Sequence, residues 1–177
     1  MAEKRTISLL WANILSIGMI VVLLAIGIFL MQLLWPDTQF KIPHSRLLIL
    51  LILIVIGIVV HELIHGITWL IAIHKDFSHL SFGIMKMSPY CHIDVPMQKH
   101  QYVVGALMPM LLLGVLPAIV ALAVGSWFWL LIGILFITAA AGDLMIVWVI
   151  RKEPNDTLVY DHPSEGGCYV YHKASQP

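Results

Sequence analysis

The sequence predicts an all-α membrane protein with four transmembrane helices and a small cytoplasmic β-hairpin between the second and third. Of its 177 residues, 60% are hydrophobic and only 11% are charged, far from the usual balance of a soluble domain. Four apolar runs, each long enough to cross a bilayer as a helix, alternate with polar segments. We expect one integral-membrane domain over residues 1–177, with spans at about 9–35, 47–73, 102–124 and 127–150 and a cytoplasmic tail at 151–177.

The first span, residues 9–35, follows a short charged head, Met1–Arg5. A basic head before an apolar run also occurs in signal peptides. This run is too long for a signal-peptide core, and no small-residue cleavage site follows it. Trp11 and Trp35 lie near its ends, where indole rings favour the membrane interface. We therefore expect an uncleaved anchor.

The second span contains the sequence His61-Glu62-Leu63-Ile64-His65. Ionisable side chains are costly inside a span and usually mark function. Residues i and i+4 of a helix share one face, so His61 and His65 can offer their imidazole nitrogens to one metal ion. Glu62 lies beside them and can act on a metal-bound water, as in the HExxH motif of zinc peptidases. A set of unreactive interhelical hydrogen bonds is the alternative that remains open here.

The segment between the second and third spans, residues 74–101, contains two stretches of alternating apolar and polar residues. Residues 80–84 and 91–95 have the period of two that is typical of strands, and Ser88-Pro89 between them is typical of a turn. We expect a hairpin beside the site, with an edge that can hold an extended peptide. Three histidines here are expected to be solvated: His79, His92 and His100.

The third span, residues 102–124, is interrupted by Pro109 and Pro117. Proline lacks the amide hydrogen of a helical hydrogen bond and so frees the carbonyl four residues earlier, here those of Gly105 and Leu113. Neighbouring groups or water must satisfy such carbonyls within a membrane. A break that faces the metal site and an ordinary irregularity of packing are equally open interpretations.

The fourth span carries a single charged residue, Asp143, which needs a partner in hydrocarbon. The cation that His61 and His65 would hold is the obvious one, because peptidase zinc commonly takes two histidines, one carboxylate and a water. We take Arg46 and Trp127 as marks of one membrane surface. At 1.5 Å per helical residue, His61 then lies about 22 Å below it and Asp143 about 24 Å. One Zn²⁺ ion is expected, although these donors also suit iron, cobalt or manganese.

Lysine and arginine are distributed unequally between the two sides of the predicted bundle. One side carries Lys4, Arg5, Lys75, Lys86, Lys99, Arg151, Lys152 and Lys173, and the other carries Lys41 and Arg46. Short cytoplasmic flanks are enriched in these residues, so we expect a multi-pass protein of the cell membrane with both termini in the cytoplasm. Cys91 and Cys168 would then face a reducing compartment and remain thiols.

The polar tail has one stretch of strand character, Cys168–Tyr171, after Gly166-Gly167. His162 and Cys168 have side chains that can bind metal, but we expect both to lie in solvent. The formal net charge of zero gives no basic surface for nucleic acid. The expected partners are the lipid bilayer and a membrane-protein or peptide substrate.

Several of these segments together resemble a known family. They are HELIHG in a span, the kinked span with Pro109, GDLM around Asp143, and the tail RKEPNDTLVYDHPSEGGCYVY. They look like the bacterial putative zincin peptidase family, formerly catalogued as a domain of unknown function. More distantly, HELIHG with a span aspartate is similar to the site-2 protease class of intramembrane metalloproteases.

The resemblance implies zinc held by His61, His65 and Asp143, with Glu62 as the catalytic base. The chain departs from site-2 proteases at the aspartate, which usually lies in an Asn-Pro-Asp-Gly or Leu-Asp-Gly setting. Here Asp143 follows Ala141-Gly142 and precedes a leucine.

We therefore expect an integral-membrane zinc metallopeptidase that hydrolyses peptide bonds at or within the membrane, with Glu62 as general base. A divalent-metal transporter is one alternative, but it needs successive ligands across the membrane, and the outer halves of all four spans lack ionisable residues. A catalytically inactive membrane-binding protein is the other, and the intact Glu62 argues against it.

Overall fold

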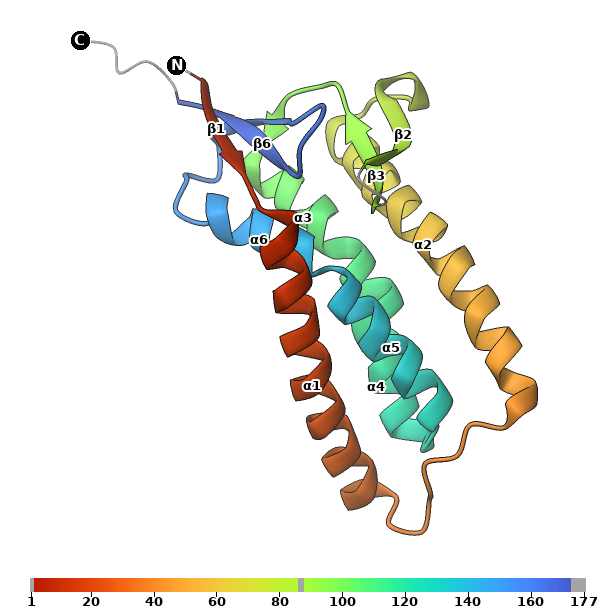
Figure 1. Ribbon diagram of the computed structural model, residues 1–177. Helices are drawn as coiled ribbons and strands as arrows, with labels where there is room; N and C mark the ends of the chain where they lie inside the picture. The colour runs from red at the N-terminus through yellow and green to blue at the C-terminus, as the bar shows by residue number, and fades with distance from the viewer. Residues whose placement is uncertain (1, 86–87, 173–177) are drawn as a thin grey trace.

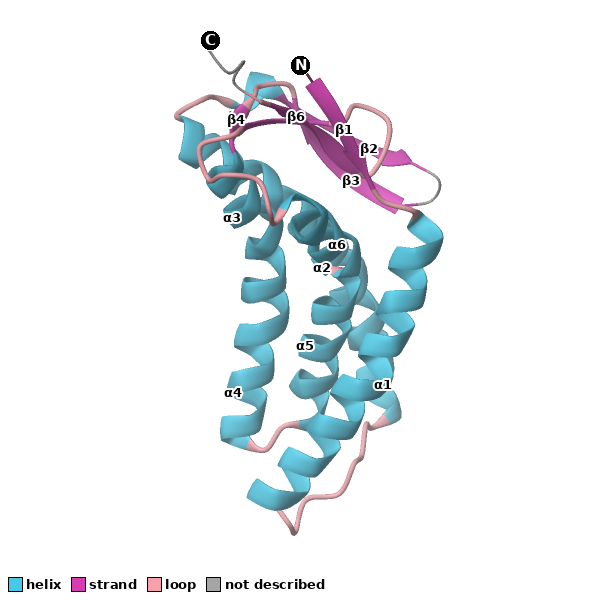
Figure 2. Cartoon of the chain, turned by 90° about the vertical axis from the view of Figure 1, so that its left-hand side faces the viewer, coloured by secondary structure: helices cyan, strands magenta, loops and turns pink. Residues whose placement is uncertain are grey.

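The computed structural model describes residues 2–85 and 88–172. The structure is mostly helical. Its long helices run side by side, and two small antiparallel sheets cover one end of them (Figure 1, Figure 2). The N-terminus lies at the covered end, and the connection between the first two helices lies at the other (Figure 1).

The helices are α1 Leu9–Leu34, α2 His44–Ile73, α3 Lys99–Pro109, α4 Leu116–Val124, α5 Trp127–Ala139 and α6 Ala141–Ile150. A π-helical segment, Met110–Val115, joins α3 to α4, and a 3₁₀ turn, Phe77–His79, follows α2.

Among the described residues, three helical stretches are long and apolar enough to cross a membrane, namely Leu9–Leu34, His44–Ile73 and Lys99–Val124. A fourth crossing results if α5 and α6 count as one span. These helices fit a multi-pass membrane protein.

The fourth predicted span, residues 127–150, is not one straight helix. It bends by 41° at Ala140, between α5 and α6. The Thr138 hydroxyl donates a hydrogen bond to the Leu135 carbonyl at 2.9 Å, a contact that tends to bend helices. Asp143 therefore lies in the first turn of a new helix, where the helix dipole favours an acidic side chain.

The predicted hairpin between α2 and α3 is formed by β2, Leu80–Met85, and β3, Ser88–Ile93, which pair antiparallel. The predicted turn was wrong, because Ser88 and Pro89 begin β3 and pair with Met85 and Ile84. Proline is tolerated near the start of an edge strand, where no ladder hydrogen bond is lost. The connection falls at residues 86–87, outside the described residues.

The second sheet has the strand order β1-β6-β5-β4. Its strands are β1 Ala2–Thr6, β6 Gly167–Tyr171, β5 Leu158–Asp161 and β4 Met97–Gln98. The tail strand was predicted from Cys168. The charged head was not predicted to be a strand, because it is extended only through its pairing with β6. The strand from Cys168 to Tyr171 belongs to this sheet and does not extend the β2–β3 hairpin as an added strand.

The tail was predicted to lie in solvent, and this prediction was wrong. The tail is folded against the ends of the helices. Cys168 is fully buried and His162 is 8% exposed. Both belong to the layer between the sheets and the ends of α2, α3 and α6. The largest cluster of buried side chains lies there: Trp69, Leu70, Cys91, Ile93, Met97, Tyr102, Ile150, Val159, Cys168 and Val170.

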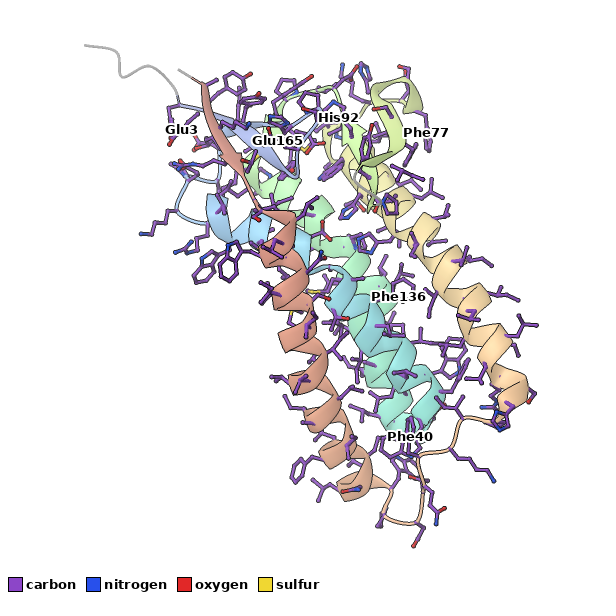
Figure 3. The ribbon with its side chains drawn as sticks, in the orientation of Figure 1. Glu3, Phe40, Phe77, His92, Phe136 and Glu165 are labelled. Atoms are coloured by element: carbon purple, nitrogen blue, oxygen red, sulfur yellow. The ribbon has the colours of Figure 1, made fainter. Side chains whose placement is uncertain are left out.

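The rest of the bundle exposes apolar side chains on its helices, such as Val21 of α1 and Val55 of α2. Phe136 of α5 lies inside the bundle against Gly57 of α2, where an added Cβ would come within 2.0 Å of its ring. Phe40 lies at the end opposite to Glu165 (Figure 3). The largest buried cluster therefore lies at the end covered by the sheets.

Candidate metal centre

Helix α2 carries two buried histidines on one face. His61 and His65 are four residues apart, and their ring centroids lie 4.8 Å from each other. The two residues are 8% and 5% exposed. Burial of two imidazoles is costly unless their nitrogens find partners, so the surroundings of these rings decide what the pair can do.

Asp143 of α6 is the side chain that both histidines face. Its Oδ2 lies 3.3 Å from His61 Nε2, and its Oδ1 lies 3.5 Å from His65 Nε2. One ligand atom from each of the three residues lies within 4.8 Å of the others. The ligands of a tetrahedral zinc, each at about 2.1 Å from the ion, lie roughly 3.4 Å apart. The donor set and the two aspartate–histidine distances therefore fit a zinc ion.

The carbonyl that Pro109 leaves free in the third span is the partner of the second histidine. Pro109 lacks the amide hydrogen that would bind the Gly105 carbonyl in a regular helix. His65 Nδ1 lies 2.9 Å from that oxygen and, as an N–H, donates to it. With Nδ1 protonated, the other ring nitrogen of His65, Nε2, faces Asp143 and would offer its lone pair to a metal ion. A metal-binding histidine needs this arrangement.

Glu62 lies next to the first histidine and is held by the hairpin. The backbone N–H of Cys91 in β3 donates a hydrogen bond to its carboxylate. Gly66 allows this approach, because an added Cβ would lie 2.6 Å from Leu80 Cδ1 and 3.0 Å from Cys91 Sγ. The glycine of HELIHG thus allows the hairpin to pack closely on α2.

A cavity of about 180 Å³ contains these groups, with His61, Glu62, His65 and Asp143 in its walls. Three further segments line the cavity, and we call them its roof. They are β3 with Tyr90 and Cys91, the segment before α1 with Ile7, and the loop between β5 and β6 with His162 and Glu165. Glu165 lies at the covered end of the molecule (Figure 3). The Ile7 N–H donates to the Gly166 carbonyl at 2.9 Å, which ties the two parts of the roof together.

The remaining histidines of the predicted loops have other partners. His79 pairs with Asp94 at 2.8 Å, and the exposed His100 lies 3.2 Å from the Asn155 carbonyl. His92 was predicted to be solvated, but its side chain is largely buried against Asp161, at 2.9 Å. The reason is the fold of the tail, which brings β5 back over the hairpin.

His162 and Cys168 do not join the metal group in the described part of the chain. His162 accepts a hydrogen bond from the Ser164 N–H at 3.2 Å and lies 3.1 Å from the Tyr169 hydroxyl. Sequence reasoning missed Trp69, which stacks on His65. The spacing of four residues from His65 was the available signal, since it places both rings on one helix face.

Comparison with known proteins gives one match. The model of a family described as "Putative zincin peptidase" matches residues 54–158, which include His61, Glu62, His65 and Asp143. No curated protein and no solved structure matches the chain.

Proposed function

The chain belongs to the putative zincin peptidase family, and from this premise we propose that it is an integral-membrane zinc metallopeptidase. The observation that carries the proposal is the buried group of His61, His65 and Asp143, with Glu62 in the same cavity. His61, His65 and Asp143 would hold one zinc ion through Nε2, Nε2 and a carboxylate oxygen. A bound zinc polarises a carbonyl and lowers the pKa of a water.

Glu62 is the general base and then the general acid in this proposal. Its carboxylate accepts a proton from the attacking water and returns it to the amine that leaves, so the water adds to the carbonyl carbon as the C–N bond breaks. The Cys91 N–H keeps one carboxylate oxygen in place. Asp143 faces the Nε2 atoms of both histidines and would offset part of the charge of the cation.

The substrate is a membrane protein or peptide presented in extended form. The hairpin lies beside Glu62, and a strand edge can bind an extended backbone by main-chain hydrogen bonds. The cavity of about 180 Å³ is smaller than the roughly 300–1,000 Å³ of typical ligand pockets. The room beside Glu62 is therefore narrow, and we expect cleavage at the membrane surface where the sheets lie.

We place four spans in the membrane, with α5 and α6 as one bent crossing, and the sheet end in the cytoplasm. Cysteines introduced by Asp37→Cys and Lys152→Cys, both at exposed positions, are expected to react with a membrane-impermeant maleimide from opposite sides. Burial raises the pKa of Cys91 and Cys168 to about 12, so the native thiols stay protonated at pH 7 to 9 and add little background. Labelling of both positions from the same side would contradict this topology.

Metal analysis of the purified protein tests the site itself. The detergent-solubilised wild type is expected to carry about one zinc per chain, since three protein ligands and a water complete a zinc shell. His61→Ala should lose most of it. His100→Ala is the matched control, because His100 is exposed and bonded only to a backbone carbonyl in the described structure. Equal metal content in the wild type and His61→Ala would exclude the assignment.

A further inference from the structure

Three aromatic rings stack in a row from the metal centre towards the tail sheet. The centroids of His65 and Trp69 lie 5.4 Å apart with 17° between the ring planes. Those of Trp69 and Tyr102 lie 5.3 Å apart with 12° between the planes. Trp69 and Tyr102 are both buried. A tilt of one ring in such a stack displaces its neighbour, because interiors are close-packed.

The stack is fixed to α3 by two hydrogen bonds. Trp69 Nε1–H donates to the Tyr102 carbonyl at 3.0 Å, and His65 Nδ1–H donates to the Gly105 carbonyl at 2.9 Å. A Cβ at position 105 would lie 2.0 Å from Trp69 Nε1, so only glycine admits the indole here. The orientation of His65 is therefore set by its hydrogen bond and by the ring stacked against it.

A carboxylate of the tail holds the far end of the stack. The Tyr102 hydroxyl donates to Asp161 Oδ1 at 2.8 Å, and His92 Nδ1 lies 2.9 Å from Asp161 Oδ2. Asp161 belongs to β5 and is 8% exposed. A buried carboxylate is stable only with such partners, so it keeps Tyr102 and His92 in fixed positions.

We propose that Asp161 is a positioning residue for the metal centre and acts through Tyr102 and Trp69 on the ring of His65. The inference rests on the proposed function, in which His65 is a metal ligand. Partners behind a metal-binding histidine set its ring orientation and the affinity of the site. Docking of β5 thus completes the metal centre, although the tail itself supplies no ligand.

Two measurements test this inference. The first is the affinity for zinc, measured by competition with a chelator. The second is the absorption spectrum of the Co²⁺ form, which reports the geometry of the ligands. Asp161→Ala should weaken binding by about tenfold, within the range of roughly 10- to 100-fold for such partners, and alter the spectrum. Asp161→Asn keeps an acceptor for the Tyr102 hydroxyl and should restore most of the affinity.

A matched pair of variants separates positioning from general destabilisation. Tyr102→Phe removes the hydroxyl that binds Asp161. Tyr169→Phe removes a hydroxyl of the same sheet, which lies 3.1 Å from His162 and outside the stack. We expect weaker binding and an altered spectrum for Tyr102→Phe, and wild-type values for Tyr169→Phe. If Asp161→Ala does not fold, this pair still decides the question.

Two results would overturn the inference alone: wild-type affinity and spectrum in both Asp161→Ala and Tyr102→Phe, or equal losses in Tyr102→Phe and Tyr169→Phe. Failure of the wild type to bind either ion would instead overturn the proposed function, and the inference with it.

Discussion

Glu62→Gln is expected to lower peptide hydrolysis by about 10²- to 10⁴-fold, the usual contribution of a general base, while the metal stays bound. The glutamine has the same shape, and its carbonyl oxygen still accepts the Cys91 N–H that holds Glu62. It cannot accept a proton from water at neutral pH. The measurement needs a cleavable substrate, which a comparison of membrane proteomes with and without the protein would provide.

Glu153→Gln is the control for this change, because Glu153 is also shielded from solvent but does not line the cavity. It should cleave at the wild-type rate. Zinc content should be equal in the wild type and both variants. Full cleavage by the Glu62→Gln protein would rule out the mechanism in which Glu62 is the base.

Asp143→Ala is expected to weaken zinc binding by at least about 100-fold, the upper end of losses seen for groups that only support a ligand. Cleavage should fall with it. Asp143 lies 3.3 Å and 3.5 Å from the two histidine Nε2 atoms, so its removal also leaves two buried imidazoles without their shared acceptor. Chelator competition and a cleavage assay at saturating zinc measure the two effects.

Asp143→Asn separates charge from shape in the same experiment. The amide keeps the size of the side chain and one oxygen, but it does not offset the charge of a cation. We expect its affinity for zinc to lie between those of the wild type and Asp143→Ala. Undiminished metal binding by both variants would show that Asp143 is not a ligand.

Features that depend on local sequence could be predicted well. The helical rise is constant, so counting residues from Arg46 and Trp127 indicated a common depth for His61 and Asp143, and their side chains lie 3.3 Å apart. Pro109 frees the Gly105 carbonyl by its covalent structure alone, and His65 binds that oxygen. The sequence did not indicate whether the break at Pro109 faces the metal site or is an ordinary irregularity of packing.

Features that depend on distant partners could not be predicted. The bend at Ala140 follows from a hydroxyl contact of Thr138, and serine or threonine inside a helix takes this conformation only in some settings. Strand β1 has no strand pattern of its own and forms because β6 lies beside it. Burial of His92 depends on Asp161, a residue far along the chain whose position no local pattern reveals.

The pairing of residues 2–6 with residues 167–171 has a consequence for biosynthesis. The helix with His61 and His65 enters the membrane long before the ribosome has made Asp143, Asp161 or strand β6. A nascent chain that has not reached these residues therefore lacks Asp143, and strand β1 lacks the strand with which it pairs. Under the proposed function, chains that end before residue 167 are expected to show no peptide hydrolysis.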